Sequence, residues 1–425
     1  MIKSPAKVLA LLTGLNLLNY LDRYVLSAVL PKIQEDLHLS NFTAGLLGAV
    51  FMVSYFLASP LFGSLADRGR RTPLLALGVC VWSVATVMSG LATGTVSLFI
   101  ARAFVGVGEA SYATIAPTLI DDLAPMEKKG RWLAIFFAAT PIGSALGYLM
   151  GGPAAQAFGW RSAFFIAGGP GILLALSCLA IVEPARVLAP VRVSVLAELR
   201  PLFAGVTRLF ARADAKLTSV SPLLEIPLYR AAVFGYCAQT AAVGAFAFWA
   251  PKFLYATHGL SLGRANVLFG AVTVIGGAVG TWLGGTLGDR AGKKLAGEDG
   301  MVRGYLRVSA WGGVVAAPAA MLAFLARSST EFFVVAFICE VGLFAATSPI
   351  NAAILRAVPE GRRASAMALT ILLIHLLGDL WSPAAVGFLA DQLPLRIAMQ
   401  VLPVGIALSA LFWWRVPRTK AVPSA

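Results

Sequence analysis

Charged residues are scarce in this sequence of 425 residues. Asp, Glu, Lys and Arg together make up 13% of it, whereas ordinary soluble domains carry roughly a quarter. Hydrophobic residues make up 58%. A single soluble core could not bury so much apolar surface, so the composition excludes an ordinary soluble domain and predicts a polytopic membrane protein.

Cysteine and histidine are also few, with four Cys and three His in the chain. Cys80, Cys178, Cys237 and Cys339 stand singly within apolar runs, without a CxxC or a Cys/His cluster. This spacing argues against a disulfide framework or a zinc site, and we interpret the cysteines as small buried side chains. We therefore expect no metal and no bound cofactor.

Apolar runs long enough to cross a bilayer, which requires about 20 residues, recur along the whole chain. Twelve are expected, over residues 6–30, 43–66, 73–93, 96–122, 131–153, 161–182, 228–256, 264–288, 304–326, 331–355, 363–391 and 394–416. The first could be a signal peptide, but no small-residue cleavage site follows it before Asp22 and Arg23, so we interpret it as a retained span. An all-α membrane protein with twelve transmembrane helices is predicted.

The formal net charge of +14 reflects the distribution of basic residues over the loops. If the N-terminus lies inside, 26 of the 34 Lys and Arg fall on the inner side, six in outer loops, and Arg23 and Arg102 within spans. This asymmetry follows the positive-inside rule, with both termini cytoplasmic. Short loops and an Ala/Gly-rich composition favour a bacterial inner membrane, and a nucleic-acid partner is not expected.

The chain divides into two halves of six spans. The longest polar stretch separates them, and a similar segment follows the second span of each half: "GSLADRGRR" from Gly63 and "GGTLGDRAGKK" from Gly284. A matched segment predicts a duplicated six-helix unit. The expected domains are residues 1–185, a cytoplasmic linker over 186–227 with a basic amphipathic helix, and 228–425. The linker is interpreted as a tether, with a regulatory role as the alternative.

These two segments resemble the loop signature of the major facilitator superfamily, the second in full and the first one residue short. Three further segments resemble the Spinster branch of that superfamily: "YLDRYVLSAVLP", "RAFVGVGEASYATIAPTLIDDLAP" and "HLLGDLWSPAAVGFLAD". The resemblance implies two pseudo-symmetric six-helix bundles around a central cavity and transport by alternating access. In several family members it further implies export of lysophospholipids or sphingosine phosphate, with proton coupling inferred for some.

Ionisable residues inside the predicted spans are candidates for function, because a charge at mid-bilayer costs about 2.5 to 3.5 kcal/mol on insertion scales. Neighbours on a helix point about 100° apart, so Asp22 and Arg23 each need a partner on another helix. At 1.5 Å per residue, Arg23 lies about 6 Å and Arg102 about 10 Å outward of the span midpoints. We predict that Arg23 pairs with Glu109 and Asp22 with Arg102.

The resemblance supports this assignment, since an Arg at the position of Arg102, followed by Gly106 and Gly108, is a recurrent superfamily motif linked to proton coupling. Burial among glycines favours the neutral form of Glu109, whereas nearby arginines favour the charged form of Asp22. Glu109 is thus the first candidate proton carrier and Asp22 the second. Protonation of Glu109 would free Arg23 for an anionic headgroup and exchange proton for substrate. Alternatively, the four charges only lock the first bundle.

Other polar and aromatic residues are predicted to face a substrate cavity. Asn16, Asn19, Arg23 and Ser27 fall on one side of the first span, and Phe51, Tyr55, Phe246 and Trp249 could form aromatic walls. The predicted substrate-binding set is Arg23, Asn19, Glu109, Tyr236, Gln239, Glu340, Asn351, His375 and Asp379. For His375 and Asp379, hydrogen bonding between helices is an equal alternative. Gly143, Gly147 and Gly151 show the small-xxx-small spacing of close helix packing.

A further group of charges lies at the inner ends of the spans and predicts a gate. Arg68 or Arg71 should reach Asp121 or Asp122, and Asp67 should approach a helix N-terminus of the opposite bundle. Such contacts would form when the cytoplasmic side closes and break when it opens. The predicted gating residues are Asp67, Arg68, Arg71, Asp121, Asp122, Asp289 and Arg290.

We expect a monomeric, proton-coupled secondary transporter, not an enzyme, that exports a lipid-like or amphipathic anion of lysophospholipid or sphingolipid type, or a hydrophobic drug. Its partners are membrane lipids and that substrate, and its coupling ion is the proton. An uptake symporter or facilitator for a small polar solute is the alternative. A membrane-embedded lipid enzyme is a weaker one, because the sequence offers no metal cluster, nucleophile–base pair or soluble catalytic domain.

Overall fold

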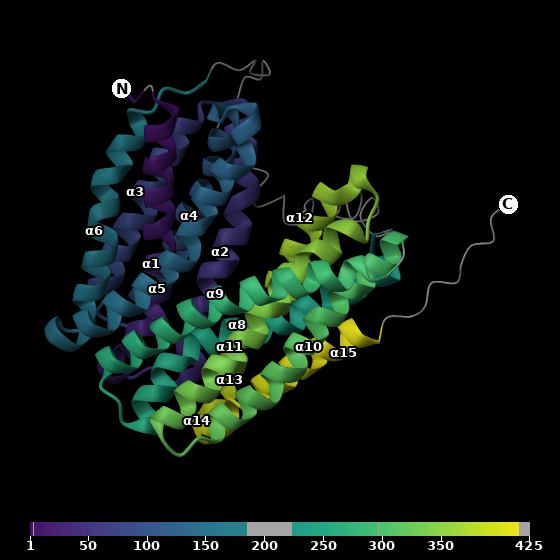
Figure 1. Ribbon diagram of the computed structural model, residues 1–425. Coiled ribbons are helices and arrows are strands. Elements are labelled where there is room, and N and C mark those ends of the chain that lie inside the picture. The colour runs from purple at the N-terminus through teal and green to yellow at the C-terminus, as the bar shows by residue number, and fades with distance from the viewer. Residues whose placement is uncertain (3, 185–222, 296, 416–425) are drawn as a thin grey trace.

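The fold was analysed in a computed structural model that describes residues 1–2, 4–184, 223–295 and 297–415. In these ranges the regular structure is helical, apart from one isolated bridge between Ile2 and Ile181. The helices form two bundles that diverge from a common base (Figure 1). Most of the predicted linker over 186–227, including its predicted amphipathic helix, lies outside the described residues.

The first bundle contains six long helices, one for each predicted span. They are α1 (Pro5–Leu37), α2 (Asn41–Arg68), α3 (Arg71–Gly90), α4 (Thr95–Leu123), α5 (Lys129–Phe158), preceded by the short η1 (Met126–Lys128), and α6 (Trp160–Leu179). We call the membrane side on which α1 begins the near side, and the side on which it ends the far side.

The second bundle repeats this arrangement with more breaks. It consists of α8 (Pro227–His258), α9 (Leu262–Lys293), α10 (Gly297–Leu325), α11 (Ser329–Arg356), η2 (Glu360–Arg362), α12 (Arg363–Ile374), η3 (His375–Asp379), α13 (Ser382–Gln392), α14 (Leu395–Ala398) and α15 (Val401–Trp414). The span expected as one helix over 363–391 is interrupted, because η3 is a turn of π-helix. The π turn packs Gly378 against α8, where an added Cβ would lie 3.1 Å from the Cys237 carbonyl.

Eleven helical segments in the described part of the chain are long and apolar enough to cross a membrane. The one predicted span that is not among these eleven is α1, which is long enough to cross a membrane at 33 residues. It is less apolar because Asn16, Asn19, Asp22 and Arg23 interrupt it, and these include the polar residues singled out as candidates for function. The predicted all-α fold with twelve spans is therefore confirmed.

Small residues hold α1 closely against α5, as the spacing of Gly143, Gly147 and Gly151 predicts. A Cβ atom added at Gly147 would lie 2.6 Å from the Leu21 carbonyl oxygen, and one added at Gly151 would lie 2.9 Å from the Ala28 side chain. Larger residues would therefore separate the two backbones. This packing fixes the position of α1, on which Asp22 and Arg23 lie.

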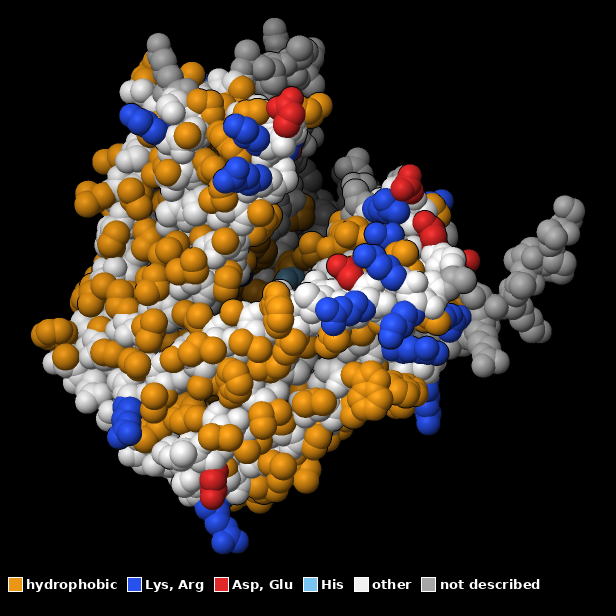
Figure 2. All heavy atoms as spheres, viewed as in Figure 1, with side chains coloured by type: hydrophobic (Ala, Val, Ile, Leu, Met, Phe, Trp, Pro, Cys, Tyr) orange, Lys and Arg blue, Asp and Glu red, His pale blue; other side chains and the backbone are white. Residues whose placement is uncertain are grey.

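The two bundles meet at their far-side ends. Asn266 of α9 donates to the Ala28 carbonyl of α1 over 3.0 Å, and Tyr148 of α5 donates to the Ala247 carbonyl of α8 over 2.7 Å. Gly45 of α2 lies against the backbone of α13 at Pro383. The near-side ends stand apart, with a hollow between the bundles in the space-filling view (Figure 2). The conformation is open to the near side and closed to the far side.

The Gly45 contact predicts a variant that opposes this closure. A Cβ at Gly45 would lie 2.5 Å from the Pro383 carbonyl oxygen, and overpacking of this kind costs about 1 to 3 kcal/mol. We expect Gly45→Leu to shift the population roughly five- to 150-fold away from far-side closure, measured by pulsed electron paramagnetic resonance between spin labels on the far-side ends. Gly169→Leu is the matched control, because nothing lies within 4 Å of a Cβ at Gly169. Unchanged distances in Gly45→Leu would show that this contact does not limit closure.

Candidate functional site

A buried ion pair between α1 and α4 lies at the centre of the first bundle. The Arg23 Nε atom donates to Glu109 Oε2 over 2.6 Å. The Glu109 side chain is fully buried, whereas 21% of the Arg23 side chain is exposed. The predicted pairing of these two residues is thus confirmed. Because the bond to Glu109 uses only the Nε–H group, other N–H groups of the Arg23 guanidinium can donate to a further anion.

Aromatic rings surround the Arg23 guanidinium. Its central carbon lies 5.0 Å from the ring centroid of Tyr20, 5.1 Å from that of Phe51 and 5.2 Å from that of Tyr55. Ring faces attract a cation at these distances, so the charge remains stabilised if Glu109 moves away. Of the two residues on α2 that were predicted to form an aromatic wall, Tyr55 is partly exposed beside Arg23, whereas Phe51 is buried.

The second predicted pair is looser than the first. Asp22 Oδ1 lies 4.0 Å from Arg102 Nη1, and neither atom makes a hydrogen bond. The Asp22 carboxyl group instead contacts the Thr86 hydroxyl of α3 through its other oxygen. The same hydroxyl lies 2.9 Å from the Trp82 carbonyl oxygen. Asp22 and Arg102 are therefore neighbours, as predicted, but they form no hydrogen-bonded ion pair in this conformation.

Thr86 was not a sequence candidate. A threonine within an apolar helix commonly bonds the carbonyl four residues back, as Thr86 does, so its sequence environment does not distinguish it. The sequence reveals its role only after α3 is placed beside α1. The nearest signal is that Thr86 lies in a run otherwise rich in apolar residues.

The other polar residues predicted along α1 do not face the open cavity. Asn16, Asn19 and Ser27 are all buried. The Asn16 side chain donates to the Phe136 carbonyl of α5 over 2.9 Å, so it joins two helices. The prediction that these residues line a cavity wall is wrong for this conformation, because all three are buried and Asn16 is bonded to α5. Substrate contact at Asn19 would require α1 to move.

Predicted residues of the second bundle fall into two groups. His375 and Asp379 form a pair within the π turn, with Nδ1 2.9 Å from Oδ1, and the His375 ring lies 5.8 Å from that of Phe56 in the first bundle. Both side chains are partly exposed, at 31% and 22%. Tyr236 is half-buried and interacts with Asn351. His375 and its partner Asp379 therefore lie where the bundles face each other.

Gln239 and Glu340 are more deeply placed. Gln239 donates to the Leu343 carbonyl of α11 over 2.8 Å, and Glu340 accepts from the Thr273 hydroxyl of α9 over 3.4 Å. Both side chains are almost fully buried. In this conformation they join helices of the second bundle instead of contacting the cavity.

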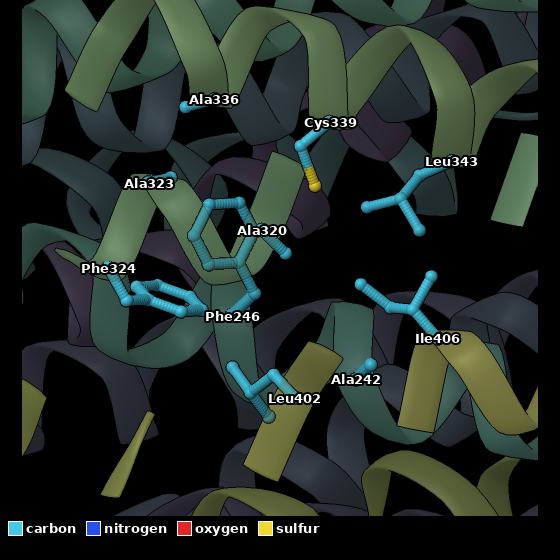
Figure 3. A pocket seen from close by; sticks show the side chains of 10 residues that line it. All are labelled: Ala242, Phe246, Ala320, Ala323, Phe324, Ala336, Cys339, Leu343, Leu402 and Ile406. Atoms are coloured by element: carbon cyan, nitrogen blue, oxygen red, sulfur yellow. The ribbon is translucent and has the colours of Figure 1, made fainter. Parts of the chain in front are cut away.

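Two aromatic residues expected in the cavity belong to the core of the structure. Trp249 is fully buried and donates its indole N–H to the Pro383 carbonyl over 2.9 Å. Phe246 lines a small enclosed apolar cavity among α8, α10, α11 and α15, into which the Cys339 sulfur also points (Figure 3). The expectation of a cavity wall is wrong for both, because α8 turns these side chains into its own bundle.

The charges at the near-side ends form contacts within their own bundles. Arg71 reaches Asp122 over 2.6 Å and Glu183 over 3.1 Å, and Lys129 reaches Asp121 over 2.8 Å. The predicted Arg71–Asp122 contact is therefore present. However, it exists while the near side is open, so the expectation that it breaks on opening is wrong. Both residues lie in the first bundle, whose internal distances need not change when the bundles separate.

Among the remaining predicted gate residues, the structure describes the side chains of Asp289 and Arg290 but not those of Asp67 and Arg68. Asp289 accepts a hydrogen bond from the Tyr305 hydroxyl over 3.2 Å, again within one bundle, and Arg290 is exposed. The side chains of Asp67 and Arg68 lie outside the described part of the structure. Their predicted approach to the opposite bundle stays a prediction.

A polar seal that sequence reasoning missed closes the far side between the bundles. Asp391 at the end of α13 accepts from the backbone N–H groups of Asn41 and Phe42, over 2.7 and 2.9 Å, at the start of α2. Lys252 of α8 donates to Gln34 over 2.6 Å and also contacts Asn41. A carboxylate is stabilised at a helix N-terminus, so this contact caps α2 from the other bundle. The Asp at the end of "GFLAD" was the available signal.

Part of this seal lies beyond the apolar run of α1, where Lys32 donates to Glu35 over 2.7 Å and to Tyr255 over 3.0 Å. The Lys32 hydrogen bond holds the pKa of Glu35 below its usual range. The contact is thus fully present above the ordinary carboxyl pKa and is lost as pH falls through the lowered value. Mild acidification therefore leaves this contact intact.

Comparisons with known proteins agree with this geometry. The family model of the Major Facilitator Superfamily matches residues 12–380. The chain is 31% identical to the probable sphingolipid transporter spinster homolog 2 of Arabidopsis thaliana, over 96% of this chain and 86% of the relative. It is 34% identical to protein spinster homolog 1 of Homo sapiens, over 91% and 73% of the two chains.

Solved structures show the same fold. A bacterial homologue of the human lysosomal transporter Spinster, in an inward-facing and unoccupied conformation, superposes with a TM-score of 0.80 at 24% identity and covers 97% of both chains. A D-xylose–proton symporter superposes with a TM-score of 0.71 at 17% identity, over 97% of this chain and 98% of the symporter. The helical fold, the duplicated bundles and the sequence matches lead to one conclusion. The chain is a membrane transporter, not an enzyme, and belongs to the Spinster family of the major facilitator superfamily.

Proposed function

We propose that this protein couples the movement of protons to the transport of a lipid-like or amphipathic anion by alternating access, and that it exports this substrate. The excess of Lys and Arg on near-side loops supports a cytoplasmic near side, with both termini in the cytoplasm of a bacterial cell. The conformation described here is then inward-facing. Transport requires the far-side seal to open and the near side to close.

One observation carries the proposal: Arg23 is paired with a fully buried carboxylate and is itself partly exposed. A buried ion pair is retained at a cost in desolvation, so a cation that also faces the cavity is suited to binding. An anionic headgroup would contact the remaining guanidinium donors, and the partly exposed rings of Tyr20 and Tyr55 would meet the apolar part of the substrate. Sphingolipid-type substrates are named for several relatives and are amphiphiles of this kind.

The hydrogen-bond arrangement supports Asp22 as the residue that holds a proton in this conformation. The Thr86 hydroxyl has one hydrogen to donate, yet it contacts both Asp22 and the Trp82 carbonyl oxygen. A protonated Asp22 could donate to Thr86, leaving the Thr86 hydrogen for the carbonyl. Glu109, which accepts from Arg23 over 2.6 Å, is then the ionised carboxylate. This assignment reverses the order of candidates expected from the sequence.

The adjacency of Asp22 and Arg23 provides the coupling. When Asp22 loses its proton, its charge attracts Arg102, which lies 4.0 Å away without a hydrogen bond. A displacement of α1 that closes this gap also moves Arg23 relative to Glu109. Proton release thereby changes how much of Arg23 is available to an anion. In this exchange mode, the protein carries an anion on Arg23 in one direction. It then returns without the anion and with a proton on Asp22.

A second coupling mode, cotransport, is favoured by the charges themselves. With Asp22 protonated, Arg23, Arg102 and Glu109 leave one uncompensated positive charge in the site. An anion neutralises that charge, whereas the four groups carry no net charge to attract it once Asp22 is ionised. Proton and anion would then bind together, as in an uptake symporter.

The near-side gate is the other part of the proposed cycle. Arg71, Asp121 and Asp122 hold their own bundle together, and Asp289 is engaged by Tyr305 within the second bundle, so these residues are not assigned to contacts between the bundles. We propose that Asp67 and Arg68, at the near-side end of α2, approach the second bundle in the near-side-closed state.

Substrate flux in proteoliposomes tests the role of Arg23 and Glu109. We expect Arg23→Gln to lower the initial rate at least tenfold, because it removes the anion donor and leaves Glu109 buried without a partner, a loss of about 3 to 5 kcal/mol. Glu109→Gln should bind substrate but lose the response to a pH gradient. Asp36→Asn, which breaks an exposed ion pair with Arg161, is the control and should stay within about twofold of wild type.

The polarity of the imposed pH gradient separates the two modes. Exchange requires acid on the side opposite the substrate to accelerate flux, and cotransport requires acid on the substrate side. If wild-type flux is the same with a pH gradient of either polarity as with no gradient, proton coupling is refuted. Normal coupling in Glu109→Gln would show that the Arg23–Glu109 pair does not take part in coupling.

The conformational role of Asp22 predicts a separate result. Asp22→Asn has the shape of the protonated acid and should hold the near-side-open population constant as pH rises, whereas wild type shifts. Thr86→Val should weaken the pH response because it removes the contact to Asp22. Ser89→Ala on the same helix, which loses a hydroxyl bonded to the Ala85 carbonyl over 3.0 Å, is the matched control. Spin-label distances across the near side measure the population, and a wild-type shift retained in Asp22→Asn would contradict the assignment.

A further inference from the structure

A groove on the outer face of the second bundle is unrelated to the central cavity. It lies between α9, α10 and α11, with Leu287 and Trp311 among its walls, and two basic residues, Arg290 and Lys294, line it at the end of α9. In the space-filling view, Lys and Arg gather at the near-side end of this bundle, next to a broad apolar face (Figure 2). The groove therefore combines a basic end with an apolar length.

The apolar part of the groove faces the hydrocarbon of the membrane. Leu287, Trp311 and Ile338 are 46%, 56% and 45% exposed, which suits contact with lipid chains. The depression exists because Gly312 and Gly342 pack backbone to backbone at its floor, where a Cβ on Gly312 would lie 2.5 Å from the Gly342 carbonyl oxygen. Side chains at the rim stand above this floor, so the space between the helices stays open.

The basic end lies at the depth of the lipid headgroups. Arg290 is about 12 residues from the middle of α9, or about 18 Å at 1.5 Å per residue, just beyond the half-thickness of about 15 Å of a hydrocarbon core. Lys294 is one turn further on the same face, and its flexible stem can reach back toward the interface. Both side chains are exposed.

The charged residues that line the groove determine which kind of lipid headgroup it favours. Among the described residues that line the groove there is no Asp or Glu, and the neighbouring Asp289 is engaged by Tyr305. The site thus offers two cations and no carboxylate to receive an ammonium group. A zwitterionic headgroup would gain less here than an anionic one, since its ammonium would lie beside Arg290 and Lys294.

We propose that this groove binds one anionic phospholipid of the near-side leaflet, with its phosphate between Arg290 and Lys294 and an acyl chain along Leu287 and Trp311. Basic pockets between transmembrane helices recognise anionic lipids in this way. The site lies on the membrane face of the second bundle and does not depend on the transport function proposed above. Its occupant is a bound membrane lipid and not the transported substrate.

Purified protein in detergent, with dioleoyl phosphatidylglycerol added in steps, tests the proposal. Native mass spectrometry counts the bound lipids, and a thermal shift measures their effect. We expect one phosphatidylglycerol to be retained and to raise the melting temperature, with much weaker effects of phosphatidylcholine. Inorganic phosphate alone should have no effect, because it cannot fill the apolar part of the groove.

Matched variants locate the binding. Each basic residue near an anionic headgroup is expected to change affinity roughly fivefold, so the double variant Arg290→Gln/Lys294→Gln should bind the lipid at least tenfold more weakly. Lys293→Gln removes the same charge from an exposed residue that does not line the groove and should bind normally. Val315→Trp, which fills the groove without changing charge, should also lose the lipid. Equal loss in Lys293→Gln, normal binding in Val315→Trp, or stabilisation by inorganic phosphate would each overturn the proposal.

Discussion

The arrangement of the first bundle depends on one constraint: a charge within the bilayer must have a partner, because no water is available to solvate it. Arg23 satisfies this constraint with Glu109 at 2.6 Å and with three aromatic rings. The pairing joins α1 to α4, and the glycines of α5 then hold α1 from the other side. Asp22, the next residue, is thereby directed toward α3 and Arg102, where its contacts are less complete. One helix thus carries both a firmly paired charge and a loosely paired one.

Much of this could be predicted from the sequence, and the reasons are physical. Apolar length sets the spans, and the fixed rise of a helix lets Arg23 and Glu109 be matched by depth. Thr86 could not be found, because a threonine bonded to its own helix has no distinctive pattern. The cavity contacts of Asn16 and Trp249 were predicted wrongly for a related reason: a helix has several faces, and the sequence does not say which neighbour covers each one. The π turn at His375 likewise depends on packing against α8.

Contacts within a bundle and contacts between bundles have different parts in alternating access. Arg71 and Asp122 form an internal contact that is intact while the near side is open, so it supports a rigid bundle. The seal at Asp391 and Lys252 crosses between the bundles and must break for the far side to open. It relies on hydrogen bonds to backbone N–H groups and to amide side chains, which separate without leaving a bare charge in hydrocarbon. The switch therefore lies at exposed ends, where water can replace the lost partners.

The far-side seal and the buried charges must nevertheless respond to each other, and α1 is the element that connects them. It carries Asp22 and Arg23 near its middle, and Gln34, which accepts from Lys252, near its far end. In the proposed cycle, a displacement of α1 that brings Asp22 to Arg102 would be transmitted along a continuous helix of 33 residues to this seal. In the proposed cycle, proton occupancy at mid-membrane biases closure at the far side in this way. Because Asp22 and Arg23 are adjacent on α1, one motion of this helix would change the contacts of both the proton-binding residue and the anion-binding residue.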